Sequence, residues 1–315
     1  MNSQAAGRHC PLDYRYQPAD IARAFTHPGL QRLDALWVVG GLYGNLEALD
    51  AVLAAYDADP SPRKALVFNG DFHWFDAEPS WFASIQAQVN AHWATRGNVE
   101  TELARDAIGD AGCGCAYPDW VADEAVAHSN RIIQDLHAAV PPGSRRALAA
   151  LPLFLRAEVG AHAVAIVHGD AHSLAGWAFS REAMQTDTGR DAAAEACTAA
   201  GVRAFASSHT CMPVLQGLGQ GRWLVNNGAA GMPNAPDDLR GLCTRIATTP
   251  PPAPAVLLQR DGDWHVSLQA VAYNTARWWQ RFAAQWPASS AAHRAYARRI
   301  QHGPGACGGP ALTER

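Results

Sequence analysis

The stretch at residues 36–56, LWVVGGLYGNLEALDAVLAAY, constrains the fold of this chain more than any other part of the sequence. Residues 36–39 form a short apolar run with two valines, which is typical of a buried strand. Gly40, Gly41 and Gly44 interrupt that run and predict a sharp turn. Leucines then recur at helical spacing. The turn is therefore expected between a strand and a helix, at the carboxyl end of the strand, where open α/β sheets carry their chemistry.

Further apolar runs along the chain also lead into short polar residues. These runs and residues are 65–69 with Asp71, 91–95 with Asn98, 163–167 with His168, and 202–206 with His209. Amphipathic segments at 78–89 and 191–200 lie between them and predict helices. A hairpin is predicted over 255–259 and 264–269. This alternation of strands and helices indicates a layered α/β fold.

The polar side chains after these runs make up a set that is typical of metal sites. The set contains one carboxylate, one amide oxygen and two imidazoles: Asp71, Asn98, His168 and His209. Mixed oxygen and nitrogen donors suit a borderline divalent ion such as Mn, Fe, Zn or Ni. Because each residue follows an apolar run, we expect all of them at one edge of the sheet.

The motifs around these residues give the pattern more specificity. They read GLYGN, GDFHW, GNVE, HGD and SHTC in chain order, and GNLEAL and NNGAAGMP flank the first and the last. Their order resembles the calcineurin-like metallophosphoesterase superfamily, whose motifs are D-x-H, G-D-x-x-D, G-N-H-[DE], a lone His and G-H-x-H. The resemblance covers residues 36–269, with an insertion between the third and fourth motifs. It implies a two-sheet β-sandwich flanked by helices, in four layers.

The resemblance also implies a role for each matched residue. The family binds two metal ions that share the aspartate of the second motif, which is Asp71 here. The second ion would be held by Asp71 with Asn98, His168 and His209, and all four are present. We therefore expect one retained metal site that binds a single divalent cation.

The other metal site of the family is degenerate in this chain. The residues that should ligate the first ion are replaced by Gly41, Tyr43 and Cys211, and Val99 replaces the usual general-acid histidine. One interpretation is that Tyr43 and Cys211 only fill the space of a lost ion, since buried free cysteine is common. The alternative is a rebuilt site that uses Tyr43, Cys211 and Asp71, with His73 nearby.

The expected activity is metal-dependent hydrolysis of a small phosphorylated substrate, of the phosphodiester or nucleotide type. The catalytic residues would be Asp71, Asn98 and His168. Arg96, just before Gly97-Asn98, is either a phosphate-binding fork or a surface arginine. The alternative function is that of a catalytically silent relative, which keeps the fold, with or without one ion, to bind a partner or ligand.

Composition excludes other classes of function. A net charge of −4 and a pI near 6.3 do not support a nucleic-acid or anionic-membrane partner. The early sequence lacks an apolar segment long enough for a signal peptide or a membrane span, so a cytoplasmic location is expected. The seven cysteines are accordingly predicted to be reduced thiols. Cys113 and Cys115 are assigned to a structured turn, because C-x-C alone is a weak metal signal. The sequence leaves the oligomeric state open.

Three regions are expected along the chain. Residues 1–33 form an N-terminal extension whose polar opening, through Tyr16, is expected to fray. Residues 34–272 form the metallophosphoesterase-like domain, with a glycine-rich and helical insertion near 106–150 that is a candidate cap over the site. Residues 273–315 form amphipathic C-terminal helices and a tail that is expected to be disordered.

Overall fold

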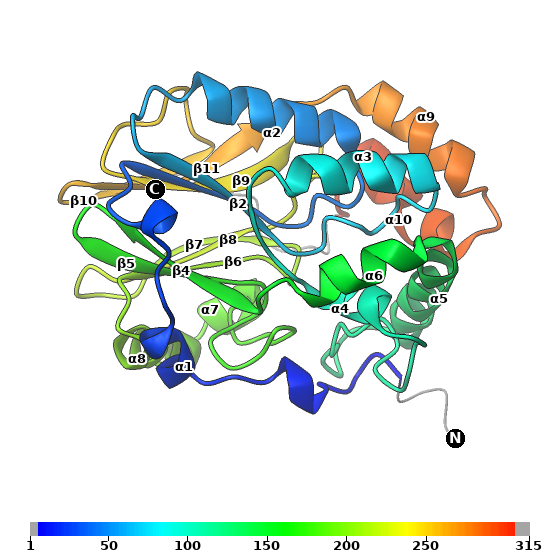
Figure 1. Ribbon diagram of the computed structural model, residues 1–315, viewed down its shortest axis with the longest axis horizontal. Helices are drawn as coiled ribbons and strands as arrows, with labels where there is room; N and C mark the ends of the chain where they lie inside the picture. The colour runs from blue at the N-terminus through cyan, green and yellow to red at the C-terminus, as the bar shows by residue number, and fades with distance from the viewer. Residues whose placement is uncertain (1–5, 306–315) are drawn as a thin grey trace.

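The computed structural model describes residues 6–305, and two mixed β-sheets stacked face to face form its centre (Figure 1). The six-stranded sheet has the order β10 (Leu257–Asp261), β11 (Trp264–Val271), β9 (Gly241–Ala247), β1 (Ala35–Val39), β2 (Lys64–Asn69) and β3 (Trp93–Thr95). The five-stranded sheet has the order β4 (Phe154–Val159), β5 (His162–Val167), β6 (Ala204–Ser207), β8 (Trp223–Asn227) and β7 (Pro213–Gly217). Strands β1, β2 and β3 run parallel, as do β5, β6 and β8.

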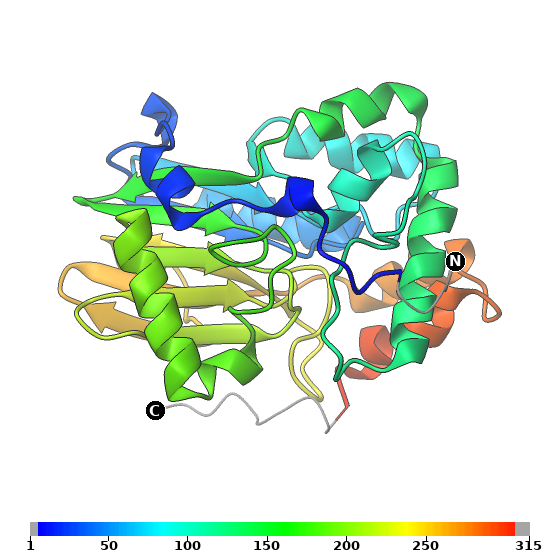
Figure 2. The ribbon, with the colours of Figure 1, turned by 90° about the horizontal axis from the view of Figure 1, so that it is seen from below.

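Helices cover both outer faces and one end of this sandwich. Over the six-stranded sheet lie α2 (Leu46–Ala58) and α3 (Pro79–Val89), with α9 (Thr275–Gln285) beside α2 (Figure 1). The five-stranded sheet is covered by α1 (Pro18–Arg23), α7 (Arg181–Met184) and α8 (Asp187–Ala200). At the end gather α4 (Asn98–Ala104), α5 (Asp123–Ala139), α6 (Pro142–Ala149) and α10 (Ala291–His302), as Figure 2 shows. Two short 3-10 helices, η1 (Leu12–Tyr14) and η2 (Pro28–Leu30), lie in the N-terminal segment.

Strand β1 shows why the sandwich has these layers. All five of its residues are buried, and successive side chains point to opposite faces of the sheet. Leu36 and Val38 pack in the cluster between the two sheets, whereas Trp37 and Val39 pack in the cluster beneath α2 and α3. Two sheets flanked by helices confirm the predicted four-layer α/β sandwich.

The N-terminal segment differs from the sequence-based expectation. The Tyr14 hydroxyl donates a hydrogen bond to Glu102 at 2.7 Å, and the Tyr16 hydroxyl donates to the Asp170 carbonyl at 2.7 Å. Both tyrosines are buried. The prediction of a frayed opening is therefore wrong for residues 6–16, because two phenols anchor the segment to the domain. Residues 1–5 and the predicted tail at 306–315 lie outside the described residues.

The insertion near 106–150 packs as a layer of its own at the end of the sandwich. Helix α6 contacts α4, and α5 contacts α10. In its glycine-rich loop a disulfide joins Cys113 and Cys115, because Gly114 in the left-handed region folds the chain back between them. The prediction of reduced thiols is wrong for this pair.

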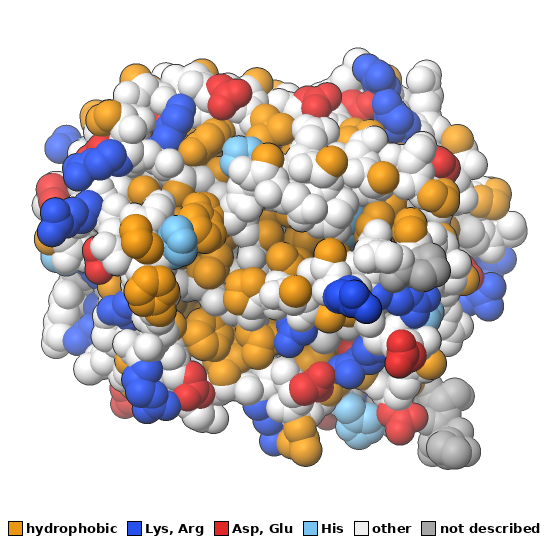
Figure 3. Space-filling view, in the orientation of Figure 1, with side chains coloured by type: hydrophobic (Ala, Val, Ile, Leu, Met, Phe, Trp, Pro, Cys, Tyr) orange, Lys and Arg blue, Asp and Glu red, His pale blue; other side chains and the backbone are white. Residues whose placement is uncertain are grey.

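Two surface properties agree with the composition. Basic and acidic side chains are interspersed on the face of the molecule in Figure 3, as expected for a chain of net charge −4. Among residues 6–305, no helix is both long enough and apolar enough to cross a membrane.

Candidate metal centre

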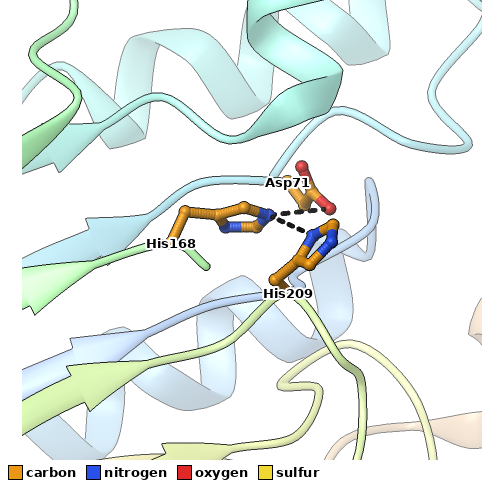
Figure 4. Close-up of side chains that lie close together, drawn as sticks. All are labelled: Asp71, His168 and His209. Carbon is orange, nitrogen blue, oxygen red and sulfur yellow. Dashed lines mark hydrogen bonds and ion pairs between the residues drawn. The ribbon is translucent and has the colours of Figure 1, made fainter. Parts of the chain in front are cut away.

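The carboxyl ends of strands from both sheets meet at one edge of the sandwich and carry the candidate site. Asp71 follows β2, His168 follows β5 and His209 follows β6, and their side chains point toward one another (Figure 4). Asn98 begins α4, directly after the turn that leaves β3. Gly97 makes this convergence possible, since a Cβ at that position would collide with the Asp71 carboxylate.

The four predicted ligands come together around one point. The Nε2 atom of His168 lies 3.3 Å from Oδ2 of Asp71, 3.2 Å from Oδ1 of Asn98 and 3.2 Å from Nδ1 of His209. Ligand atoms of Asp71, His168 and His209 all lie within 4.8 Å of one another. All four side chains are buried. The order of the motifs therefore predicted which side chains gather, and their role as metal ligands stays a prediction.

Hydrogen bonds on the outside of the cluster determine which atoms face inward. Nδ1 of His168 lies 2.9 Å from the Asn69 carbonyl, and Nε2 of His209 lies 3.1 Å from the Cys115 carbonyl. Because a carbonyl only accepts, these outer nitrogens carry the protons and the inner nitrogens present lone pairs. Asn98 donates from Nδ2 to the Cys113 carbonyl at 2.9 Å, so its oxygen faces inward as well.

A cluster of inward-facing acceptors needs one positive charge. Burial opposes protonation of His168, but the Asp71 carboxylate outweighs it and raises the pKa of His168 above its ordinary value. Burial disfavours the charged form of Asp71, yet His168 and His209 together hold the pKa of Asp71 below its usual range. Burial, and then His168, lower the pKa of His209 to about 3. A proton on His168 or a metal cation satisfies the cluster, and the donor set fits a borderline divalent ion.

Glu100 supports the site from behind and was not selected from the sequence. Its buried carboxylate accepts the backbone N–H groups of Asp71 and Gly97, each at 2.8 Å, and those of Phe72 and His73. These bonds hold the turn in which Asp71 has a φ of 53°. The available signal was the acidic fourth residue of the GNVE motif.

The place of the other family metal holds a phenol and a thiol. The Tyr43 hydroxyl lies 2.6 Å from Sγ of Cys211, which also contacts the His209 carbonyl at 3.1 Å. Burial raises the pKa of both Tyr43 and Cys211, so both groups keep their protons near neutral pH. His73 is turned toward Asp76 and Gln86. These bonds favour the interpretation that Tyr43 and Cys211 fill the space of a lost ion.

A pocket of about 180 Å³ opens beside the cluster. Its walls come from the strand ends, from the insertion and from α10: Tyr43, Asp71, Trp74, Asn98, Val99, Cys115, Tyr117, Trp177, His209, Thr210, Cys211, Tyr296 and Arg299. The structure does not bring Arg96 to this wall, since its guanidinium donates to the Ala149 carbonyl at 3.2 Å. The arginine that lines the pocket is Arg299 of α10, which sequence reasoning missed.

Comparison with solved structures identifies the architecture. A metallophosphoesterase from Sphaerobacter thermophilus matches 86% of this chain and 100% of its own, with a TM-score of 0.55 and 16% sequence identity. A hypothetical protein from Pyrococcus horikoshii OT3, PH1004, matches 86% of this chain and 99% of its own, with a TM-score of 0.59 and 15% identity. No protein-family model and no curated protein matches the chain. The chain therefore has the metallophosphoesterase fold, as the motifs predicted, and carries a candidate metal site at its edge.

Proposed function

We propose that this chain hydrolyses small phosphate esters, of the phosphodiester or nucleotide type, with one divalent cation held by Asp71, Asn98, His168 and His209. The observation that supports this most is the convergence of their acceptor atoms on Nε2 of His168. Such a cluster is electrostatically incomplete without a cation or a proton. When bound, a divalent ion supplies charge neutralisation for the phosphate and lowers the pKa of a water molecule.

Arg299 is the residue we assign to hold the substrate phosphate. Its Nε donates to the Pro233 carbonyl at 3.1 Å and one terminal nitrogen donates to the Cys211 carbonyl at 3.0 Å, which orient the guanidinium at the pocket wall. A guanidinium has five N–H donors, so others remain for phosphate oxygens. Arg299 would therefore act as a pre-oriented positive charge in the same pocket as the metal cluster.

Val99 limits the range of leaving groups. It lines the pocket where the family has a histidine and cannot donate a proton to a departing oxygen. The nearby phenol of Tyr43 has a raised pKa and is a poor acid. Substrates whose leaving group departs without protonation are therefore expected to react fastest.

Activity assays with a matched histidine pair test this proposal. Purified protein loaded with Mn is expected to hydrolyse bis(4-nitrophenyl) phosphate, and Asp71→Asn or His168→Ala should lower turnover by at least about 100-fold. His172→Ala is the control, because His172 is exposed and does not line the pocket. Turnover that survives in Asp71→Asn would show that the activity comes from another site or a contaminant.

The second candidate is a ligand-binding protein without turnover. The observation that favours it is the Tyr43–Cys211 pair, which fills the place of one family metal. A protein that binds Mn and a phosphate ester through Asp71 but hydrolyses none of a panel of activated esters would support this function over hydrolysis.

A further inference from the structure

The pocket beside the metal cluster has an aromatic wall that the proposed hydrolysis does not use. Tyr117 and Trp177 line it, and both come from loops outside the strand ends that carry the ligands. The indole nitrogen of Trp177 donates to the Cys115 carbonyl at 3.0 Å, the carbonyl that also orients His209. Trp177 is thus held in a defined position next to a metal ligand.

A series of ring contacts runs from the metal cluster to the surface. The ring centres of His209 and Trp177 lie 5.4 Å apart, and those of Trp177 and Trp120 lie 5.4 Å apart. Tyr117 contacts Trp177 at 5.9 Å. Trp120 is 61% exposed, although a tryptophan gains much from burial.

Trp120 is not needed to hold its own turn. Arg8 donates to the carbonyls of Pro118 and Val121, each at 2.8 Å, and the Val121 N–H bonds to Pro118. The turn is therefore fixed through backbone groups. The indole ring has an exposed surface that is available to a ligand.

We propose that Trp177 and Trp120 form a subsite for a planar aromatic ring carried by the phosphate ester. This inference rests on the proposed function, which places the phosphate between the metal cluster and Arg299. An aromatic ring attached directly to the phosphate would lie against Trp177 and next to Trp120, since the centres of these two rings are 5.4 Å apart. A nucleobase, separated from the phosphate by a sugar, would reach Trp120. Stacking on one aromatic side chain strengthens binding by about tenfold.

Binding to the Trp120→Ala variant tests the subsite. Titration calorimetry on the Mn-loaded protein would use adenosine 5′-monophosphate, phenyl phosphate and methyl phosphate as probes. We expect the variant to bind adenosine 5′-monophosphate about tenfold more weakly and methyl phosphate as the wild type does, with Trp120→Phe close to wild type. Phe25→Ala is the matched control, since Phe25 is an exposed aromatic residue like Trp120, but its ring contacts His27 and not the pocket residue Trp177.

The phenyl phosphate titration distinguishes the two sources of the ring. Weaker binding of adenosine 5′-monophosphate alone assigns Trp120 to a nucleobase, and weaker binding of phenyl phosphate as well assigns the subsite to aryl esters. Equal affinities of wild type and Trp120→Ala for both aromatic probes would overturn the inference, as would wild-type protein that binds none of the three.

The outcome for this subsite can be separated from the outcome for hydrolysis. If the protein prefers aromatic probes through Trp120 but hydrolyses no ester, the result supports the subsite and contradicts the proposed function. If the protein hydrolyses esters, and wild type and Trp120→Ala have the same preference for aromatic over methyl esters, the result supports the proposed function and contradicts the subsite.

Discussion

The two halves of the site, a metal half with Asp71, His168 and His209 and a thiol half with Tyr43 and Cys211, differ in how their polar groups are satisfied. On one side, Asp71, His168 and His209 turn acceptor atoms toward one another, and only a cation or a proton relieves their repulsion. On the other side, the phenol of Tyr43 and the thiol of Cys211 satisfy each other at 2.6 Å. The difference teaches that two adjacent groups of buried polar residues can be satisfied in different ways, one by a donor–acceptor pair and the other only by an added positive charge.

The backbone nevertheless adopts the same unusual conformation in both halves. Tyr43, Asp71, His209 and Cys211 all have positive φ, at 55°, 53°, 34° and 57°. Non-glycine residues rarely adopt this region and are strained there. Strain that persists on the side without a metal cluster indicates that the turns are held by the fold, so that only the side chains decide where an ion binds.

The largest effect is expected on metal affinity, when one side chain of the metal half and, in a separate variant, one side chain of the thiol half are truncated. His209→Ala should weaken Mn or Zn binding by more than about 100-fold, because even outer-sphere partners of a metal cost 10- to 100-fold. Cys211→Ala, two residues away on the same loop, should leave the affinity unchanged. Both positions have positive φ, so the two variants share the same backbone strain. Metal content after equilibrium dialysis measures both, and equal losses would remove the contrast between the two halves.

Restoring the second half is expected to have the next largest effect. The triple variant Gly41→Asp, Tyr43→His and Cys211→His should raise the metal content from one ion per chain to two. Turnover should rise by about 10- to 100-fold, since a second cation would share the phosphate charge. A second bound ion without faster hydrolysis would contradict the view that its absence limits the rate.

The single variant Gly41→Asp is the control for this experiment. A Cβ at Gly41 would lie 3.1 Å from the ring of Tyr43, and Gly41 has a φ of 62°. The single variant should therefore be destabilised without gaining an ion, and Tyr43→His should relieve the crowding. The contact indicates that a side chain at position 41 and the Tyr43 ring would compete for the same space.

Sequence reasoning predicted that Asp71, Asn98, His168 and His209 gather, because each follows an apolar run and lies in a motif that matches the family in order; their role as ligands stays a prediction. The strand at 65–69 and the turn at Asp71 are adjacent in the chain, so a short motif contains both. The wall of the pocket could not be predicted in this way. Arg299 and Trp177 reach the site from segments whose local pattern says nothing about where they pack.

Strand β9 was missed for a related physical reason. Arg245 lies in the middle of this strand and is fully buried, where a charged residue normally argues against a central strand. Its guanidinium donates from Nε to Asp59 at 2.8 Å. The two residues are 186 positions apart, so no local sequence pattern around Arg245 includes the carboxylate that compensates its charge. Helix α4 was missed because its seven residues are too few to show a helical period.

The smallest expected effect is a pH dependence that differs between the two halves. Without metal, the raised pKa of His168 stabilises the fold fully below the unfolded value of about 6.5, and this contribution is lost as pH rises through the folded value. The lowered pKa of His209 changes the stability of the fold only below about pH 6.5, where the unfolded chain binds a proton that the folded chain does not. The raised pKa of Cys211 changes the stability of the fold only above about pH 8.5, where the unfolded chain loses a proton that the folded chain keeps. Between these limits the metal half should respond to pH and the thiol half should not.

Urea unfolding in chelator between pH 6.5 and 8.5 measures this response. Stability of the wild type should fall with rising pH, by at most about 1.4 kcal/mol per pH unit for each proton released. His73, whose pKa the Asp76 carboxylate raises against the effect of burial, contributes in the same direction, so His168→Gln provides the necessary comparison. The slope should become shallower in His168→Gln, remain in Cys211→Ser, and become shallower in the wild type when saturating Mn replaces the proton on His168, with the contribution of His73 left in place. An unchanged slope in His168→Gln would mean that the acceptor cluster holds no proton, and the electrostatic distinction between the two halves would fail.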